Sequence, residues 1–206
     1  MSSIQNQGAH GALIYVAIGA SDVVGEGADK PDTEAWPIVI YERLPKGTVI
    51  HRLGVSGSTA EEATVEQLPA AETLEPNLVT IWLAINDIRN QVPLETYRKS
   101  LDEIVRRMTD TGAQVFVGNV PDLRGIPELA ESYRPDQLTA FTAEWNATIA
   151  EVVLANGAHL VDLQEASEGM EQEEMQVLIS EDRFHPSTLG HVALAEIFLH
   201  HIESAF

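Results

Sequence analysis

Short apolar runs rich in β-branched residues alternate with longer amphipathic stretches along the whole chain. The apolar runs predict five strands, at residues 13–18, 48–53, 78–85, 115–117 with their flanks, and 159–163. Apolar residues spaced three or four positions apart predict three long helices. These cover residues 93–111, residues 135–156, and a final stretch that Pro186 opens.

Strands that alternate with helices favour an α/β fold, because the crossovers between parallel strands place helices on both faces of a sheet. We therefore predict a three-layer α/β/α sandwich with a five-stranded parallel sheet, in a single domain over residues 1–206. Residues 1–10 are expected to form a flexible N-terminal extension. Residues 164–181 include the polar run Glu171-Gln172-Glu173-Glu174, which predicts a solvated connection with a short helix.

Composition narrows the possible partners. The net charge is −20, from 32 acidic and 12 basic residues, so nucleic acid and anionic membranes would be repelled. The chain has no cysteine, which excludes disulfides, cysteine-type zinc sites and a thiolate nucleophile. The hydrophobic content of 44% is sufficient for one core.

The apolar residues 11–20 resemble the central part of a secretory signal, but no Lys or Arg precedes them. We interpret them as the first buried strand. No segment approaches the roughly 18–20 apolar residues that span a bilayer, so we expect no membrane span and a cytoplasmic location. A secreted chain trimmed of its signal would look the same.

The candidate chemistry lies at the predicted strand ends, where open parallel sheets bind their ligands. Ser21, Gly54 and Asn86 follow or end the first three strands, and Asp182 precedes His185 by three residues. Each feature alone is typical of a helix cap, a tight turn or a surface ion pair. Together they provide a nucleophile, a base, an orienting acid and donors for an oxyanion, which is the residue set for acyl transfer.

Four blocks of sequence around these residues resemble the SGNH hydrolases, also called GDSL-type esterases and lipases. They are residues 17–21 (Ala-Ile-Gly-Ala-Ser) with Gly25 and Gly27, residues 53–60 (Leu-Gly-Val-Ser-Gly-Ser-Thr-Ala), residues 84–87 (Ala-Ile-Asn-Asp), and residues 182–187 (Asp-Arg-Phe-His-Pro-Ser). The resemblance runs from about residue 13 to residue 195. It implies a flavodoxin-like sandwich and a serine esterase, either monomeric or homodimeric, that needs no cofactor and no metal.

The resemblance also assigns roles to individual residues. Ser21 would carry the acyl group, His185 would act as the base, and Asp182 would orient the imidazole. The backbone N–H groups of Ser21 and Gly54 and the side-chain amide of Asn86 would hold the oxyanion. The substrate would be a small-molecule carboxylic ester.

Two positions depart from the family pattern. Ala20 stands where the family usually has Asp, and Ala84 stands where it usually has Gly. Losing the Asp is expected to weaken the hydrogen bonding that positions the serine loop. The methyl group of Ala84 is expected to narrow the space beside the acyl carbon.

The identity of the substrate stays open at this point. A chain of 206 residues leaves little room for a lid, so small or short-chain acyl esters are favoured over triglycerides. A carbohydrate O-deacetylase with the same triad is the nearest alternative, since Trp36, Trp82 and Trp145 are able to stack on a sugar; we expect all three in the core. A hypothesis of another class is a non-catalytic binding protein that keeps the fold.

Overall fold

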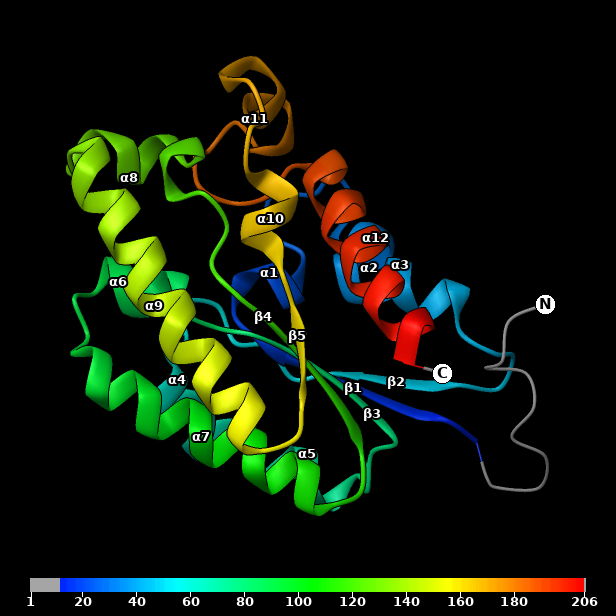
Figure 1. The fold of residues 1–206 in the computed structure, drawn as a ribbon. Helices are drawn as coiled ribbons and strands as arrows, with labels where there is room; N and C mark the ends of the chain where they lie inside the picture. The colour runs from blue at the N-terminus through cyan, green and yellow to red at the C-terminus, as the bar shows by residue number, and fades with distance from the viewer. Residues whose placement is uncertain (1–11, 206) are drawn as a thin grey trace.

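A parallel five-stranded sheet forms the centre of the protein in the computed structural model, which describes residues 12–205 (Figure 1). The extension expected over residues 1–10 lies outside the described residues. The strand order is β2-β1-β3-β4-β5, and all neighbouring pairs are parallel. The strands are β1 (Ile14–Gly19), β2 (Val49–Arg52), β3 (Leu78–Trp82), β4 (Gln114–Gly118) and β5 (His159–Val161). The predicted α/β fold and parallel sheet are confirmed.

The helices fall between the strands, as the alternating pattern predicts. They are α1 (Ser21–Val24), α2 (Pro31–Glu34), α3 (Trp36–Arg43), α4 (Ala60–Glu66), α5 (Leu68–Thr73), α6 (Ile85–Arg89), α7 (Leu94–Asp110), the 3-10 helix η2 (Leu123–Gly125), α8 (Pro127–Ser132), α9 (Pro135–Ala155), α10 (Leu163–Ser167), α11 (Gln172–Leu178) and α12 (Thr188–Ala205).

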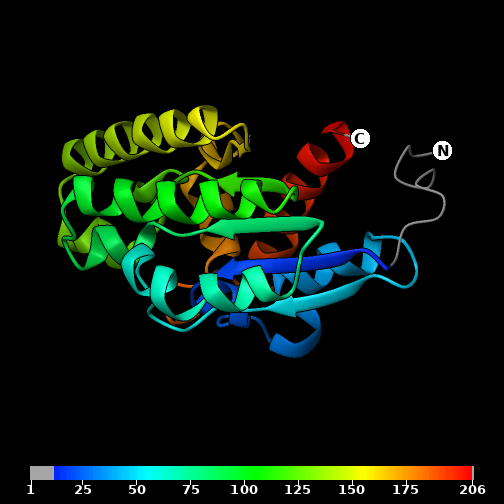
Figure 2. The same ribbon diagram turned by 90° about the horizontal axis from the view of Figure 1, so that it is seen from below.

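Alternation along β1 builds the two faces of the sheet. Val16 and Ile18 pack on the side of α4, α5, α7 and α9, whereas Tyr15 and Ala17 pack on the side of α3 and α12. Successive strand residues point to opposite faces, so one strand serves both cores. Figure 1 shows the two helical layers on either side of the sheet, and Figure 2 shows α9 running alongside α7.

Three element boundaries differ from the sequence expectation. The third strand ends at Trp82 rather than at residue 85, because Ala84 adopts a φ of 146° and the chain turns into α6. The fifth strand ends at Val161, and α10 begins at Leu163. The last helix begins at Thr188, because Pro186 forms an antiparallel bridge with Ile179 instead of opening it.

Residues 164–181, expected to form a solvated connection with one short helix, are mostly helical. They contain most of α10 and all of α11, and Leu163 and Met175 at these helices are buried. This segment packs toward α12. It therefore forms part of the wall of the site described below.

The three tryptophans are buried, as expected for core residues. Trp36 is 0% exposed, Trp145 is 5% exposed and Trp82 is 9% exposed. Trp36 stacks on Phe198 with 4.7 Å between the ring centroids. Burial at this level leaves Trp36 and Trp145 no face for a sugar.

Candidate active site

Ser21 is the first residue of α1, and one residue, Ala20, separates it from the end of β1. The strand delivers it to the carboxyl edge of the sheet, where its side chain is nearly buried. The turn is tight, because a β-carbon on Gly19 would come within 2.9 Å of the Trp82 carbonyl oxygen. A glycine is therefore needed at the strand end that presents Ser21.

Ser21, His185 and Asp182 form a continuous hydrogen-bonded chain. The Nδ1 atom of His185 lies 2.6 Å from the Asp182 Oδ2 atom. Its Nε2 atom lies 2.9 Å from the Ser21 Oγ atom. A carboxylate only accepts hydrogen bonds, so the Nδ1 atom carries the proton and Nε2 is left to accept from the Ser21 hydroxyl. The structure thus brings Ser21 together with the Asp182 and His185 pair, although Ser21 and His185 are 164 positions apart in the sequence.

The loop that carries Asp182 and His185 is held by its own backbone. The Ser180 N–H donates to the His185 carbonyl at 2.8 Å, and the Ser187 N–H donates to the Leu178 carbonyl at 2.8 Å. Asp182 Oδ1 also accepts from the N–H groups of Phe184 and His185, each at 2.9 Å. One short loop therefore fixes the geometry of both polar side chains.

The same contacts keep Asp182 ionised. Partial burial acts to raise its pKa, but the hydrogen bonds from the His185 ring and from the N–H groups of His185 and Phe184 outweigh it. The pKa of Asp182 therefore lies below the usual value for aspartate. An ionised Asp182 is the form that stabilises a protonated imidazole.

Gly27 permits the segment that follows α1 to approach His185 closely. Its φ is 91°, and a β-carbon there would lie 2.8 Å from the His185 Cβ atom and 2.2 Å from the Pro186 carbonyl oxygen. Any other residue would push the imidazole away from Ser21. The close contact therefore gives a physical reason for Gly27 in the first family-like block.

Two of the expected oxyanion donors are backbone N–H groups. Among the residues that the structure describes, the backbone N–H groups of Ser21 and Gly54 have no hydrogen-bond acceptor. A β-carbon on Gly54 would lie 2.5 Å from the Val23 Cβ atom and 2.7 Å from the Ala20 carbonyl oxygen. Gly54 is thus required by close packing against the serine loop, and its N–H is available to a ligand.

Asn86 lies near the start of α6, and its side-chain amide donates to the Ser58 carbonyl at 3.1 Å. This contact orients the Nδ2 group, which has a second hydrogen to offer. Asn86 and Ser21 both line the pocket described below. Ala84, two residues earlier, has the positive φ that favours glycine, which accounts for the usual family residue there.

Asp22 is a site-forming residue that the sequence analysis missed. Its Oδ1 atom accepts from the Ala20 N–H at 3.1 Å, and its Oδ2 atom accepts from the Trp36 Nε1–H at 2.7 Å. Burial raises the pKa of Asp22 to about 6, although both hydrogen bonds act to lower it. Asp22 therefore supplies a carboxylate to the serine loop one residue after Ser21, where the family pattern has one directly before it.

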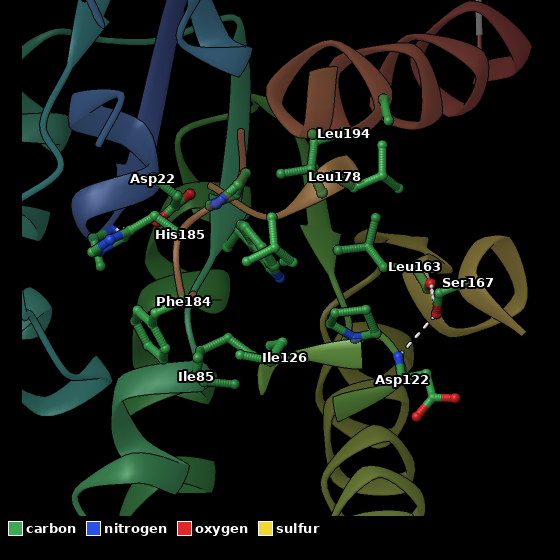
Figure 3. Close-up of a pocket in the computed structure, with 18 of the residues that line it drawn as sticks. Asp22, Ile85, Asp122, Ile126, Leu163, Ser167, Leu178, Phe184, His185 and Leu194 are labelled. Atoms are coloured by element: carbon green, nitrogen blue, oxygen red, sulfur yellow. Dashed lines mark hydrogen bonds between the residues drawn. The ribbon is translucent and has the colours of Figure 1, made fainter. Parts of the chain in front are cut away.

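An apolar pocket opens beside Ser21 and His185 (Figure 3). In Figure 3, Phe184, Ile85 and Ile126 lie on the triad side of the pocket, and leucines from α10, α11 and α12 lie across from them. The leucines are Leu163, Leu178 and Leu194. The segment with α10 and α11 therefore closes the far side of the pocket with apolar side chains.

A second carboxylate, which the sequence analysis also missed, lies near His185. The Glu26 Oε2 atom is 3.3 Å from the His185 Nε2 atom, and Glu26 also accepts a hydrogen bond from Ser56. Glu26 and Ser56 are not among the residues that line the apolar pocket. The catalytic edge thus has an apolar side and a polar side.

Two further findings concern ligands and membranes. Among the side chains that the structure describes, no three from His, Asp or Glu gather closely enough to hold a metal ion. No helix in the described part of the chain has both the length and the apolar composition needed to cross a membrane.

Comparison with known proteins agrees with this geometry. Residues 16–193 match the GDSL-like Lipase/Acylhydrolase family. The chain belongs to this family. It is accordingly a carboxylic ester hydrolase of the GDSL, or SGNH, type.

The individual proteins that this chain resembles are distant from it in sequence. An acetylxylan esterase from Geobacillus stearothermophilus is 24% identical over 167 residues, covering 79% of this chain and 75% of its own. Among solved structures, TesA has a TM-score of 0.75 at 17% identity, covering 94% of this chain and 99% of its own. LAE5, a hydrolase from the metagenome of Lake Arreo, Spain, has a TM-score of 0.73 at 23% identity, covering 93% of this chain and 95% of its own. These structural matches show a shared fold.

Proposed function

We propose that the protein hydrolyses carboxylic esters through an acyl-enzyme formed on Ser21, with His185 as base and Asp182 as the orienting residue. The observation that carries the proposal is the hydrogen-bonded chain from Ser21 Oγ through the His185 ring to Asp182. Two solved structures of the Geobacillus acetylxylan esterase are of catalytic mutants, in which a serine or a histidine is replaced by alanine. A serine and a histidine in that relative thus support the roles of Ser21 and His185.

The acylation step follows from this arrangement. The Ser21 oxygen attacks the ester carbonyl carbon while its proton moves to the His185 Nε2 atom. The resulting imidazolium is stabilised by Asp182, which is ionised because its pKa is low. Collapse of the tetrahedral intermediate breaks the bond to the alcohol oxygen, which takes the proton from Nε2. Water then repeats the sequence and releases the acid.

Charge on the carbonyl oxygen develops during both steps. The N–H groups of Ser21 and Gly54 and the amide of Asn86 would donate to this oxygen. Removing one donor of this kind typically costs about 2.7–4 kcal/mol of transition-state stabilisation. The close packing of Gly54 on Val23 supports the assignment, because it fixes one donor relative to Ser21.

The apolar lining of the pocket favours the binding of an apolar acyl chain over a polar acyl group. The pocket walls include Ile85 and Phe184 on the triad side and Leu194 on the opposite side. Burying a CH₂ group against such walls contributes about 0.8 kcal/mol. The pocket extends past the reacting atoms to α10 and α11, so it has room for more than an acetyl group. We therefore propose short acyl chains longer than acetyl as the preferred acyl part.

A carbohydrate O-deacetylase is the second candidate. It is favoured by the 24% identity to an acetylxylan esterase. The apolar lining argues against it, because an acetyl group would leave most of this surface in contact with water.

The test is hydrolysis of nitrophenyl esters from acetate to decanoate by the parent protein and by Ser21→Ala. We expect a maximum above acetate and a loss of at least about 10⁴-fold in kcat for Ser21→Ala. Ser132→Ala is the matched control, because Ser132 is exposed on α8 and bonds only the Glu128 carbonyl among its described contacts.

Two outcomes would redirect the assignment. Unchanged turnover by a folded Ser21→Ala protein would reject Ser21 as nucleophile. A maximum at acetate, with acetate release from acetylated xylo-oligosaccharides, would favour the deacetylase instead.

A further inference from the structure

The backbone of Glu26 is fixed by hydrogen bonds on both its N–H and its carbonyl side. Its N–H donates to the Ser21 carbonyl at 2.9 Å, and its carbonyl is 3.0 Å from the Nε2 atom of the buried His191. It lies between Gly25 and Gly27, which have φ values of 99° and 91°. The backbone on both sides therefore depends on glycines that bring Glu26 to the catalytic edge.

Its carboxylate points at the reacting nitrogen. The Glu26 Oε2 atom is 3.3 Å from the His185 Nε2 atom, and the side chain of Glu26 is 41% exposed. Its other oxygen accepts from the Ser56 hydroxyl. The Ser56 hydroxyl uses its one hydrogen in this contact, but lone pairs on both carboxylate oxygens and on the Ser56 oxygen remain, so the pair can accept from a further donor.

The position of this pair identifies the part of the ester that would meet it. Nε2 must reach both the Ser21 oxygen and the leaving alcohol oxygen, because it passes a proton from one to the other. The apolar pocket lies against Ser21 and His185 on one side, and Glu26 with Ser56 lies outside it. If the pocket takes the acyl chain, the alcohol lies on the side of Glu26.

We propose that Glu26 and Ser56 form a binding site for the alcohol part of the ester, and that this site selects monoesters of vicinal diols. The proposal rests on the proposed function. The leaving oxygen would lie at Nε2, and the neighbouring hydroxyl would donate to the Glu26 carboxylate. Hydrogen bonds to a charged acceptor are roughly twice as strong as neutral ones, so Glu26 is a specificity-determining residue in this account.

The same carboxylate makes the site unfavourable for anionic alcohols. A carboxylate on the carbon next to the ester oxygen would lie against Glu26, with like charges close together. The two expectations are independent, because the first depends on an acceptor atom and the second depends on charge.

The experiment compares kcat/KM for 2-hydroxyethyl butyrate and propyl butyrate, which differ by a hydroxyl in place of a methyl group. We expect the parent protein to prefer the hydroxyl ester by about tenfold. Glu26→Leu should bring the ratio close to one, and Glu26→Gln, which keeps an acceptor without charge, should give an intermediate ratio. For carboxymethyl butyrate, Glu26→Gln should raise kcat/KM relative to the propyl ester.

Glu66→Leu is the matched control, because Glu66 is an exposed residue of α4 with no side-chain partner among the described contacts. It should leave the ester ratio at the parent value. A ratio near one in the parent protein, or a ratio that Glu26→Leu does not change, would overturn the proposal while leaving the esterase assignment intact. Failure of the parent protein to hydrolyse any ester would instead reject the proposed function itself.

Discussion

At the residue scale, two buried carboxylates support the catalytic edge. Asp22 holds the Ala20 N–H and the Trp36 ring beside Ser21. Asp87, which follows Asn86, is fully buried and accepts from the Ala60 N–H with both oxygens, at 3.2 and 3.1 Å. Both connect the loops that carry the reacting groups. The function of each is positional, because neither reaches the Ser21 hydroxyl.

Asp87 gives the protein a pH-dependent stability that can be measured. Burial raises its pKa from 3.8 to about 7, against the hydrogen bond from Ala60. The folded state therefore holds the proton more tightly than the unfolded state, and stability from this group falls as pH rises from about 4 to about 7. In Asp87→Asn this dependence is absent. We expect the free energy of unfolding of the variant, relative to the parent, to increase by a few kcal/mol from pH 5 to pH 8.

Urea unfolding at both pH values measures this difference. The comparison between pH values cancels any fixed effect of replacing an oxygen by an amide. An equal difference between variant and parent at pH 5 and pH 8 would show that Asp87 keeps its ordinary pKa in the fold.

At the element scale, the junctions between strands and helices position the site. The junction between β3 and α6 is strained at Ala84. The φ of 146° at this residue is a conformation that residues with a side chain rarely adopt, and such strain costs about 1–3 kcal/mol. Ala84→Gly removes the strain but also loses a buried methyl group, worth about 0.8 kcal/mol. We expect it to be neutral or stabilising. Ala63→Gly, at an equally buried position inside α4, should cost about 1–2 kcal/mol.

Urea unfolding of the two variants tests the difference between these positions. The prediction fails if Ala84→Gly destabilises the protein as much as Ala63→Gly does. Activity toward nitrophenyl butyrate would also show whether the Ala84 methyl group narrows the space beside the acyl carbon.

Sequence periodicity predicted the strands and long helices well, because apolar patterns report burial in the sheet directly. It missed the end of β3, since Leu83 and Ile85 continue the apolar run and the turn depends on the backbone of Ala84. It misread residues 164–181, because polar residues around Glu171 hide the inward-facing Met175 and Leu178. Such contacts depend on which helix faces the pocket, and the local sequence does not predict the position of a helix relative to the pocket.

The three triad candidates were predictable because the family blocks fix their spacing to strand ends. Glu26 and Asp22 were not, since their chemistry depends on partners far away in the sequence. Glu26 meets Ser56 and His185, and Asp22 meets Trp36. A residue whose function arises from long-range contacts leaves little local signal.

At the scale of the whole molecule, the chain carries a net charge of −20. A negative field lowers the local concentration of anionic substrates, and salt screens it over a Debye length of about 10 Å at 0.1 M. We expect kcat/KM for nitrophenyl hemisuccinate to rise several-fold between about 10 mM and 150 mM salt. The neutral nitrophenyl butyrate is the control and should change little. An equal response of both esters would contradict a role for the field.

The central claim is that Ser21 forms a covalent bond with the acyl group. The most direct test is incubation with a nitrophenyl alkylphosphonate, in which a bond from a serine oxygen to phosphorus forms as nitrophenolate leaves, followed by peptide mass spectrometry. We predict one phosphonyl group per chain on the peptide that contains Ser21, no label in Ser21→Ala, and much slower labelling in His185→Ala. Stoichiometric label on another residue, or none on the active parent protein, would contradict the account.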